Sequence, residues 1–268
     1  MKTRILTGVI AGILALVVLI WMPPVATFIV MSLLAAMAVY EMIGAMKLKH
    51  CPELTVLCVL MALVVAYFPY MSMKYVTLAL CVYGLLLACV VLYRHESVTM
   101  VRIVSMGMLT LLIACGLSGI AYLRGYAHGL WMLFLALMIA WMSDIGAYFT
   151  GSFFGKHKLC PKISPKKTVE GFVGGIVFSV AICTIYAWIY GLVTNASVDL
   201  LRVALLSLVG APISVLGDLF ASVIKRQHDV KDYGWILPGH GGIMDRFDSV
   251  IFVAPVVVLW IQWLPLVG

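Results

Sequence analysis

Residues 130–149 read LWMLFLALMIAWMSDIGAYF, an apolar run whose only charged side chain is Asp144. A helix needs about 20 apolar residues to cross the roughly 30 Å of hydrocarbon in a bilayer, so this run predicts a transmembrane helix. A carboxylate within such a helix is costly and normally faces a partner or a water-filled cavity. The stretch therefore predicts both a membrane-spanning fold and a polar site inside it.

The rest of the chain has the same character. Of its 268 residues, 64% are hydrophobic and only 11% are charged, and the mean hydropathy is +1.13, values that argue against a water-soluble fold. The apolar runs are long and continuous rather than short and alternating, so we expect an all-α integral membrane protein, a polytopic bundle of about nine transmembrane helices. The expected spans lie near residues 5–22, 25–46, 54–70, 75–93, 103–123, 130–150, 170–192, 202–224 and 249–267.

Basic residues predict how this bundle is oriented. Of the 18 Lys and Arg residues, all but Lys74, Arg124 and Arg202 fall on one side of the expected membrane. The positive-inside rule then places the N-terminus in the cytoplasm and the C-terminus on the opposite face. The two long polar stretches, 151–169 and 225–248, both fall on the cytoplasmic side, and loops of that length usually carry function.

We expect a single transmembrane domain over residues 1–268. Residues 1–125 would provide scaffold or dimer contacts, and residues 126–268 would form the catalytic part. The net charge of +7 follows from loop position, and no basic helix or aromatic platform is present to bind nucleic acid. The seven cysteines form no CxxC pair and are expected to be reduced.

Acidic residues gather at one depth of this topology. Asp144, Asp218 and Glu170 lie at the cytoplasmic ends of three spans, and Asp245 and Asp248 lead into the last one. Several carboxylates at one level suit a hard, oxygen-seeking cation such as Mg²⁺, which retains waters and takes substrate phosphates as further ligands. The sequence therefore predicts a magnesium site at the inner membrane surface.

Groups that bind phosphate lie beside these acids. Asp218, Ser222 and Lys225 are spaced along one face of a helix. A glycine-rich segment could approach an anion closely with its backbone N–H groups. The proposed phosphate ligands are Ser222, Lys225, Arg226, Lys231, His240, Gly241, Gly242, Arg246, Lys166 and Lys167. Together with the acids they indicate phosphoryl or nucleotidyl transfer on a lipid.

Simpler interpretations exist for several of these residues. The acids and bases could be ion pairs that lock helices, and Lys166 and Lys167 could anchor a loop to anionic lipid. Glu170 and Glu41 could be helix-terminus charges, or they could hold a metal- or phosphate-binding residue in place by contacting it. The Gly171-x-x-x-Gly175 spacing is most simply a helix-packing face.

The signature of these polar stretches resembles the phosphatidate cytidylyltransferase family, also called CDP-diacylglycerol synthases. It reads Ser222-Val-Ile-Lys225-Arg226, then Lys231-Asp232-Tyr-Gly234, then Leu237-Pro238-Gly239-His240-Gly241-Gly242-Ile-Met-Asp245-Arg246-Phe-Asp248. A second similar stretch reads Asp144-Ile-Gly-Ala-Tyr148, Phe154-Gly-Lys-His-Lys-Leu and Ile163-Ser164-Pro165-Lys166-Lys167-Thr168-Val-Glu170-Gly171. The resemblance covers about residues 144–248.

This resemblance implies that CTP and phosphatidic acid are converted to CDP-diacylglycerol and pyrophosphate with Mg²⁺. The implied catalytic residues are Asp218, Lys225, Arg226, Asp245 and Asp248, and the implied metal ligands are Asp218, Asp245, Asp248 and Asp144. The family further implies a homodimer in the bacterial inner membrane, with its active site facing the cytoplasm. Ala221 stands where the family usually has Glu, so the number of metal ions, one or two, stays open.

Two other functions compete with this one. A CTP-using lipid kinase of the polyprenol kinase type would transfer the γ-phosphoryl group instead and release CDP. A transporter would place carboxylates near span centres and break helices in matching halves, whereas the carboxylates here cluster at one end.

Overall fold

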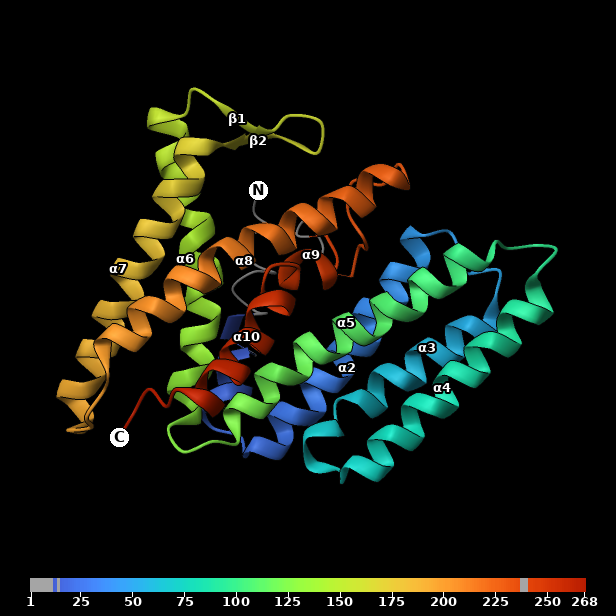
Figure 1. Ribbon diagram of the computed structural model, residues 1–268, viewed down its shortest axis with the longest axis horizontal. Helices are drawn as coiled ribbons and strands as arrows, with labels where there is room; N and C mark the ends of the chain where they lie inside the picture. Colours follow the sequence, from blue (N-terminus) through green and yellow to red (C-terminus); the bar gives the residue numbers. More distant parts are fainter. Residues whose placement is uncertain (1–11, 14, 237–240) are drawn as a thin grey trace. The chain divides into compact units, whose positions relative to one another are not determined.

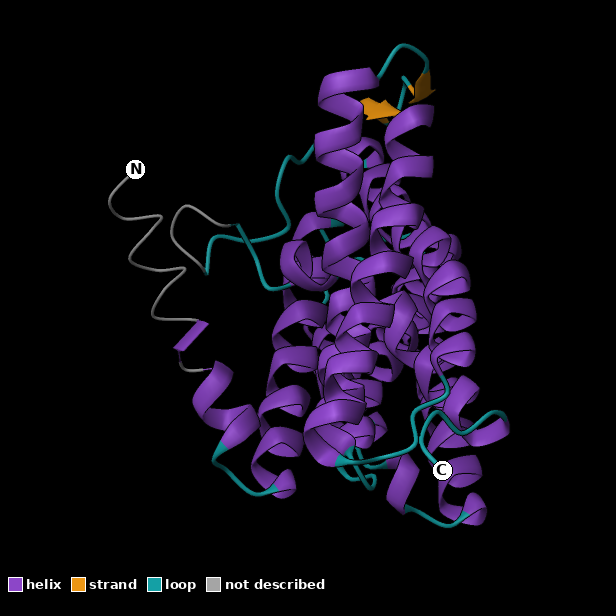
Figure 2. Ribbon diagram, turned by 90° about the vertical axis from the view of Figure 1, so that its left-hand side faces the viewer, coloured by secondary structure: helices purple, strands orange, loops and turns teal. Residues whose placement is uncertain are grey.

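The chain folds almost entirely into helices in a computed structural model that describes residues 12–13, 15–236 and 241–268. Within these ranges, two short strands are the exception to a helical fold (Figure 2). The elements are α2 (Pro24–Ala45), α3 (Pro52–Val65), η1 (Phe68–Tyr70), α4 (Met73–Arg94), α5 (Met100–Arg124), α6 (Gly129–Phe154), β1 (Lys158–Cys160), β2 (Ser164–Thr168), α7 (Val169–Thr194), α8 (Leu200–Gln227), α9 (Met244–Phe247) and α10 (Val250–Trp263).

The described helices confirm a polytopic membrane fold. Six of them, α2 and α4 to α8, are long and apolar enough to cross a bilayer, and each matches an expected span. Helices α3 and α10 are apolar but only 14 residues long, about 21 Å at 1.5 Å per residue. Pro265 follows two residues after α10 and could not complete its backbone hydrogen bonding, whereas α3 ends four residues before Pro69, which lies within η1. The expected first span, 5–22, lies largely outside the described residues.

The chain divides into two compact units, and the first combines the chain up to Tyr122 with residues His228–Phe247. In this unit α2 packs on α3, and α3 packs on α4 (Figure 1). Ala35, Ala38 and Met42 recur at helical spacing on α2 and have no exposed surface. The short helix α9 also contacts α2. Much of the polar stretch 225–248 therefore belongs to the same unit as the N-terminal helices.

The second unit contains Leu123–Gln227 and Asp248–Gly268. Helices α6 and α7 make the most extensive contact, and α8 and α10 pack against them or each other. A Cβ atom placed on Gly171 would lie 2.7 Å from the backbone oxygen of Ala147, and one on Gly175 would lie 2.5 Å from that of Ser143. The two helices thus approach too closely for a side chain at either glycine. This confirms Gly171-x-x-x-Gly175 as a packing face.

A β-hairpin between α6 and α7 departs from the all-α expectation. Strand β1 pairs antiparallel with β2, so that Lys158 lies opposite Thr168 and Cys160 lies opposite Ser164. Pro161 and Pro165 disfavour a helix here, and a two-stranded sheet has only edge strands, in which proline is tolerated. At the end of β2 the Thr168 hydroxyl accepts a hydrogen bond from the Gly171 N–H at 3.1 Å and caps α7. The predicted loop 151–169 therefore contains the end of α6, an ordered hairpin from Lys158 to Thr168 and the first residue of α7.

We predict that Gly175→Ala destabilises the protein, because its methyl group would collide with backbone rather than with a movable side chain. Overpacking of this kind costs about 1–3 kcal/mol, which should lower the thermal midpoint of the detergent-solubilised protein. Gly84→Ala is the matched control, since nothing lies within 4 Å of its added methyl group. Equal midpoints for the two variants would contradict the close approach of α6 and α7.

Candidate active site

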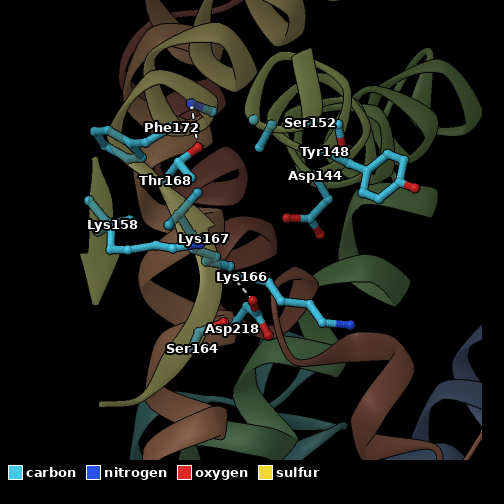
Figure 3. A pocket seen from close by; sticks show the side chains of 15 residues that line it. Asp144, Tyr148, Ser152, Lys158, Ser164, Lys166, Lys167, Thr168, Phe172 and Asp218 are labelled. Atoms are coloured by element: carbon cyan, nitrogen blue, oxygen red, sulfur yellow. Dashed lines mark hydrogen bonds and ion pairs between the residues drawn. The ribbon is translucent and has the colours of Figure 1, made fainter. Parts of the chain in front are cut away.

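A cavity in the second unit collects four of the predicted site residues. It has a volume of about 530 Å³, in the range of small-molecule sites, and is lined by α6, α7, α8 and the hairpin (Figure 3). Asp144 comes from α6 and Asp218 from α8, whereas Lys166 and Lys167 come from β2. The structure therefore brings together two predicted metal ligands and two predicted phosphate ligands that are far apart in the sequence.

The Lys167 ammonium forms an ion pair with the Asp218 carboxylate. Their side chains are only 22% and 27% exposed, so the pair is shielded from water on most sides. A shielded pair is screened less by salt than a surface pair. In the absence of ligands, Asp218 therefore has a cation supplied by the chain itself.

Asp248 lies in the turn before α10 and adds a third carboxylate to this unit. Its Oδ1 accepts a hydrogen bond from the Ser249 N–H at 2.8 Å. Burial raises the pKa of Asp248 to about 7, with the negative charge of Asp218 as the next cause. Lys225 lowers that pKa and Asp144 raises it. The charges of Asp218 and Asp144 therefore disfavour ionisation of Asp248, and the charge of Lys225 favours it.

The chemistry of these donors fits a magnesium ion that is shared with a substrate. In the part of the chain that the structure describes, no three His, Cys, Asp or Glu side chains are grouped closely enough to enclose a metal ion. Mg²⁺ does not require such a cage, because it is usually held by one or two carboxylates together with waters and substrate phosphates. Asp218 and Asp248, whose carboxylates influence each other, could provide those oxygen ligands.

The end of α8 carries the other basic residues of this unit. Arg226 is exposed, and its Nε lies 3.4 Å from the Ile163 carbonyl oxygen, a long hydrogen bond to the turn of the hairpin. Ser222 and Lys225 precede it on the same helix and are half-buried. The hairpin and the last turn of α8 thus lie side by side.

Glu170 attaches the start of the hairpin to α7. Its carboxylate accepts hydrogen bonds from the backbone N–H groups of Lys156 and His157, at 3.1 and 3.2 Å. It also lies 2.6 Å from the His157 Nδ1 atom. Both of its interpretations from the sequence, a helix-terminus charge and a supporting residue, agree with this position.

Two lining residues, Lys158 and Ser152, were not singled out by the sequence. Ser152 follows Asp144 and Tyr148 at four-residue intervals, a spacing that places all three on one face of α6. That spacing was a usable signal. Lys158 offered no comparable signal, because its place depends on pairing opposite Thr168 in the hairpin.

Two described segments of the signature loop, residues 231–236 and 241–247, belong to the first unit and are linked by Asp245. One oxygen, Oδ2, accepts hydrogen bonds from the Tyr233 N–H at 2.8 Å and the Gly242 N–H at 3.0 Å. Gly241 has φ +80°, in the left-handed region that favours glycine. Asp245 therefore ties the segment around Tyr233 to the segment around Gly242.

For the remaining predicted residues of this loop, the structure gives less information. Lys231 and Arg246 are exposed in the same unit, and His240 lies outside the described residues. Their assignment to phosphate, like that of Gly241 and Gly242, stays a prediction.

Comparison with known proteins extends the likeness beyond residues 144–248. The sequence model described as "Cytidylyltransferase family" matches residues 2–264. The chain is 37% identical over 262 residues to the phosphatidate cytidylyltransferase of Bacillus subtilis (strain 168), with 95% of each chain covered. It is 35% identical over 266 residues to the protein of the same name from Staphylococcus haemolyticus (strain JCSC1435), covering 98% of this chain and 100% of the relative. The chain belongs to the cytidylyltransferase family.

Proposed function

We propose that this protein is a phosphatidate cytidylyltransferase, which converts CTP and phosphatidic acid to CDP-diacylglycerol and pyrophosphate. The observation that carries the proposal is the cavity in which carboxylates on α6 and α8 face lysines on the hairpin. It lies in a membrane protein whose relatives of nearly equal length are named for this activity. Both substrates bring phosphates, and the site offers cations and carboxylates to match them.

The reaction joins the two substrates through one displacement at phosphorus. A phosphate oxygen of phosphatidic acid forms a bond to the α-phosphorus of CTP, and the bond from that phosphorus to the oxygen bridging it to the β-phosphorus breaks. Pyrophosphate leaves with the bonding electrons. No covalent bond to the protein is needed, because holding the reactants in line and neutralising their charge lowers the barrier.

The lysines of the hairpin neutralise charge in this scheme. Lys158, Lys166 and Lys167 all line the cavity, so their ammonium groups can pair with phosphate oxygens. When a phosphate arrives, Lys167 can exchange its contact with Asp218 for one with the substrate. Lys225 and Arg226, in the last turn of α8, add positive charge within the same unit.

The carboxylates provide the metal site. Asp218 and Asp248 would hold Mg²⁺, with Asp144 close by, and the ion would supply charge neutralisation at phosphate oxygens. Without Mg²⁺, the carboxylates would repel one another and the substrate phosphates. Binding of Mg²⁺ should therefore increase the affinity for substrate, and substrate should increase the affinity for Mg²⁺. Metal ligation by Asp245, and phosphate binding by Ser222, Lys231, His240, Gly241, Gly242 and Arg246, are proposals that rest on the signature.

We place the site at the cytoplasmic face of a bacterial inner membrane. The bias of Lys and Arg among the loops supports a cytoplasmic N-terminus, nine spans and a C-terminus on the opposite face. CTP is then present in the cytoplasm, on the same side of the membrane as the site, and phosphatidic acid can enter the site from the inner leaflet. A homodimer is the expected assembly, and the catalytic part is expected within residues 126–268.

The first test is a product assay. Purified protein incubated with α-labelled CTP, phosphatidic acid and Mg²⁺ should transfer the label into the organic phase as CDP-lipid and release pyrophosphate. A lipid kinase would instead leave the α-label in water as CDP. Absence of any lipid-soluble label would refute the proposed function, and so would substrate uptake into proteoliposomes without CTP turnover.

The second test removes single carboxylates. Asp218→Asn and Asp248→Asn should each reduce turnover by at least about 100-fold, because each removes a charge that the metal ion requires. Asp199→Asn is the matched control, since Asp199 pairs with Arg202 on another part of the same unit. Membrane insertion should be unchanged in all three variants. Wild-type activity in both test variants would contradict the metal assignment.

The third test uses pH in the presence of EDTA. The pKa of Asp248 is raised from 3.8 to about 7, so its protonated form is favoured by folding. The corresponding stability is complete below about pH 4 and is lost as pH rises through the folded-state pKa. The thermal midpoint of the wild type should therefore fall more between about pH 5 and pH 8 than that of Asp248→Asn.

Mg²⁺ should restore the midpoint of the wild type at the higher pH and have less effect on Asp248→Asn. Asp199→Asn should follow the wild type at every pH. An equal fall for the wild type and Asp248→Asn would show that Asp248 does not titrate in this way.

A further inference from the structure

Glu41 is a buried acid in α2, within the first unit, and the mechanism above does not use it. The residue is 5% exposed. Its Oε2 accepts a hydrogen bond from the Met244 N–H at 3.0 Å, whereas its buried Oε1 has no hydrogen-bond partner in the described part of the chain. Burying a carboxylate with one oxygen unmatched is costly, so such a group calls for a reason beyond helix packing.

The space around this carboxylate is provided by two glycines of the signature. A Cβ atom on Gly234 would lie 2.2 Å from Glu41 Oε1, and one on Gly242 would lie 2.3 Å from Oε2. Neither glycine is among the positive-φ residues, which include Gly241. Conformational freedom therefore does not explain glycine at these two positions. Glycine at these positions instead leaves room for the Glu41 carboxylate.

Gly242 lies between the Glu41 carboxylate and Asp245, the acid of the loop itself. Its Cα faces Glu41, and its N–H donates to Asp245 Oδ2 at 3.0 Å. The same Asp245 oxygen also accepts from the Tyr233 N–H. Asp245 thus ties two segments of the loop together from within. Glu41, 203 positions before Met244, accepts a hydrogen bond from the second segment and lies close to Gly234 in the first.

We propose that Glu41 is a positioning residue, which holds the signature loop in the conformation used for cytidylyl transfer. This inference rests on the proposed function. The segments that Glu41 contacts lead directly into Lys231 and Arg246, which are proposed phosphate ligands. A loop released from α2 would leave those groups poorly placed, although Glu41 itself touches no reacting atom.

The first experiment compares Glu41→Ala with Glu41→Gln in the full-length, detergent-solubilised protein. Glu41→Gln keeps the length and one carbonyl oxygen to accept from Met244, so it should keep most of the activity. Glu41→Ala removes the acceptor and should lower kcat/KM by about 10- to 100-fold, as for other residues that hold ligands in place. Equal activity of the alanine variant and the wild type would overturn the inference, and so would equal losses in both variants.

Amide hydrogen exchange without substrates gives a second readout that does not depend on turnover. Glu41→Ala should accelerate exchange in peptides covering Tyr233, Gly242 and Met244 and leave peptides from α6 and α7 unchanged. Unchanged exchange in the loop would overturn the inference. If the wild type shows no cytidylyl transfer, the proposed function fails, whereas accelerated exchange still identifies Glu41 as the residue that orders the loop.

A double-variant cycle tests the steric argument itself. Gly242→Ala alone should lower the thermal midpoint, because its methyl group would collide with the Glu41 carboxylate. In the Glu41→Ala background the same methyl group has room, so the two shifts should not add. Gly84→Ala in the same background is the control and should add, because its surroundings are open. Additive shifts for Gly242→Ala would overturn the packing role of Glu41.

Discussion

The ion pair between Lys167 and Asp218 is the central interaction of the second unit, in which the charges of Asp144 and Asp218 also act on Asp248. Each carboxylate comes from a different part of the chain, and burial leaves little water to screen their charges. Negative charge in such a place requires a cation. Within the chain, Lys167 is the cation that pairs with Asp218. In the proposed function, Mg²⁺ would take the place of Lys167 at Asp218, and a substrate phosphate would pair with Lys167. The chain therefore holds a proposed metal ligand, Asp218, in direct contact with a proposed phosphate ligand, Lys167.

The position of Lys167 depends on backbone structure rather than on the lysine itself. Strand β2 ends at Thr168, whose hydroxyl caps α7, and Glu170 in the next turn binds the beginning of the hairpin. Helix α7 is in turn fixed against α6 because Gly171 and Gly175 allow their backbones to approach. Packing between two apolar helices thus determines where the Lys167 ammonium group lies in the cavity.

The sequence predicted the parts of this arrangement that depend on periodicity and depth. The position of a residue along a span fixes its height in the membrane, so Asp144 and Asp218 could be placed at one level without knowledge of packing. The Gly171-x-x-x-Gly175 contact was predictable because small residues at that spacing share one helical face. The six long described helices matched expected spans for the same reason.

Pairing across the sequence could not be predicted in this way. The hairpin depends on which residues of β1 lie opposite those of β2, so the approach of Lys158 to the cavity was missed. The lengths of α3 and α10 were overestimated, since hydropathy continues past the residue at which the helix ends. Glu41 was interpreted as either a helix-terminus charge or a residue that supports a ligand, and its contact with Met244 joins residues 203 positions apart. Nothing local in the sequence records such a contact.

Because Glu41 fits between two glycines, it also limits which substitutions these three positions can accept during evolution. Positions 41, 234 and 242 share one small volume, so a larger residue at either glycine requires a smaller one at position 41. Conversely, a relative with a short side chain at position 41 no longer needs glycine at the other two. Substitutions at these positions should therefore be correlated among descendants of a common ancestor, even though two of the three lie in the signature and the third in an N-terminal helix.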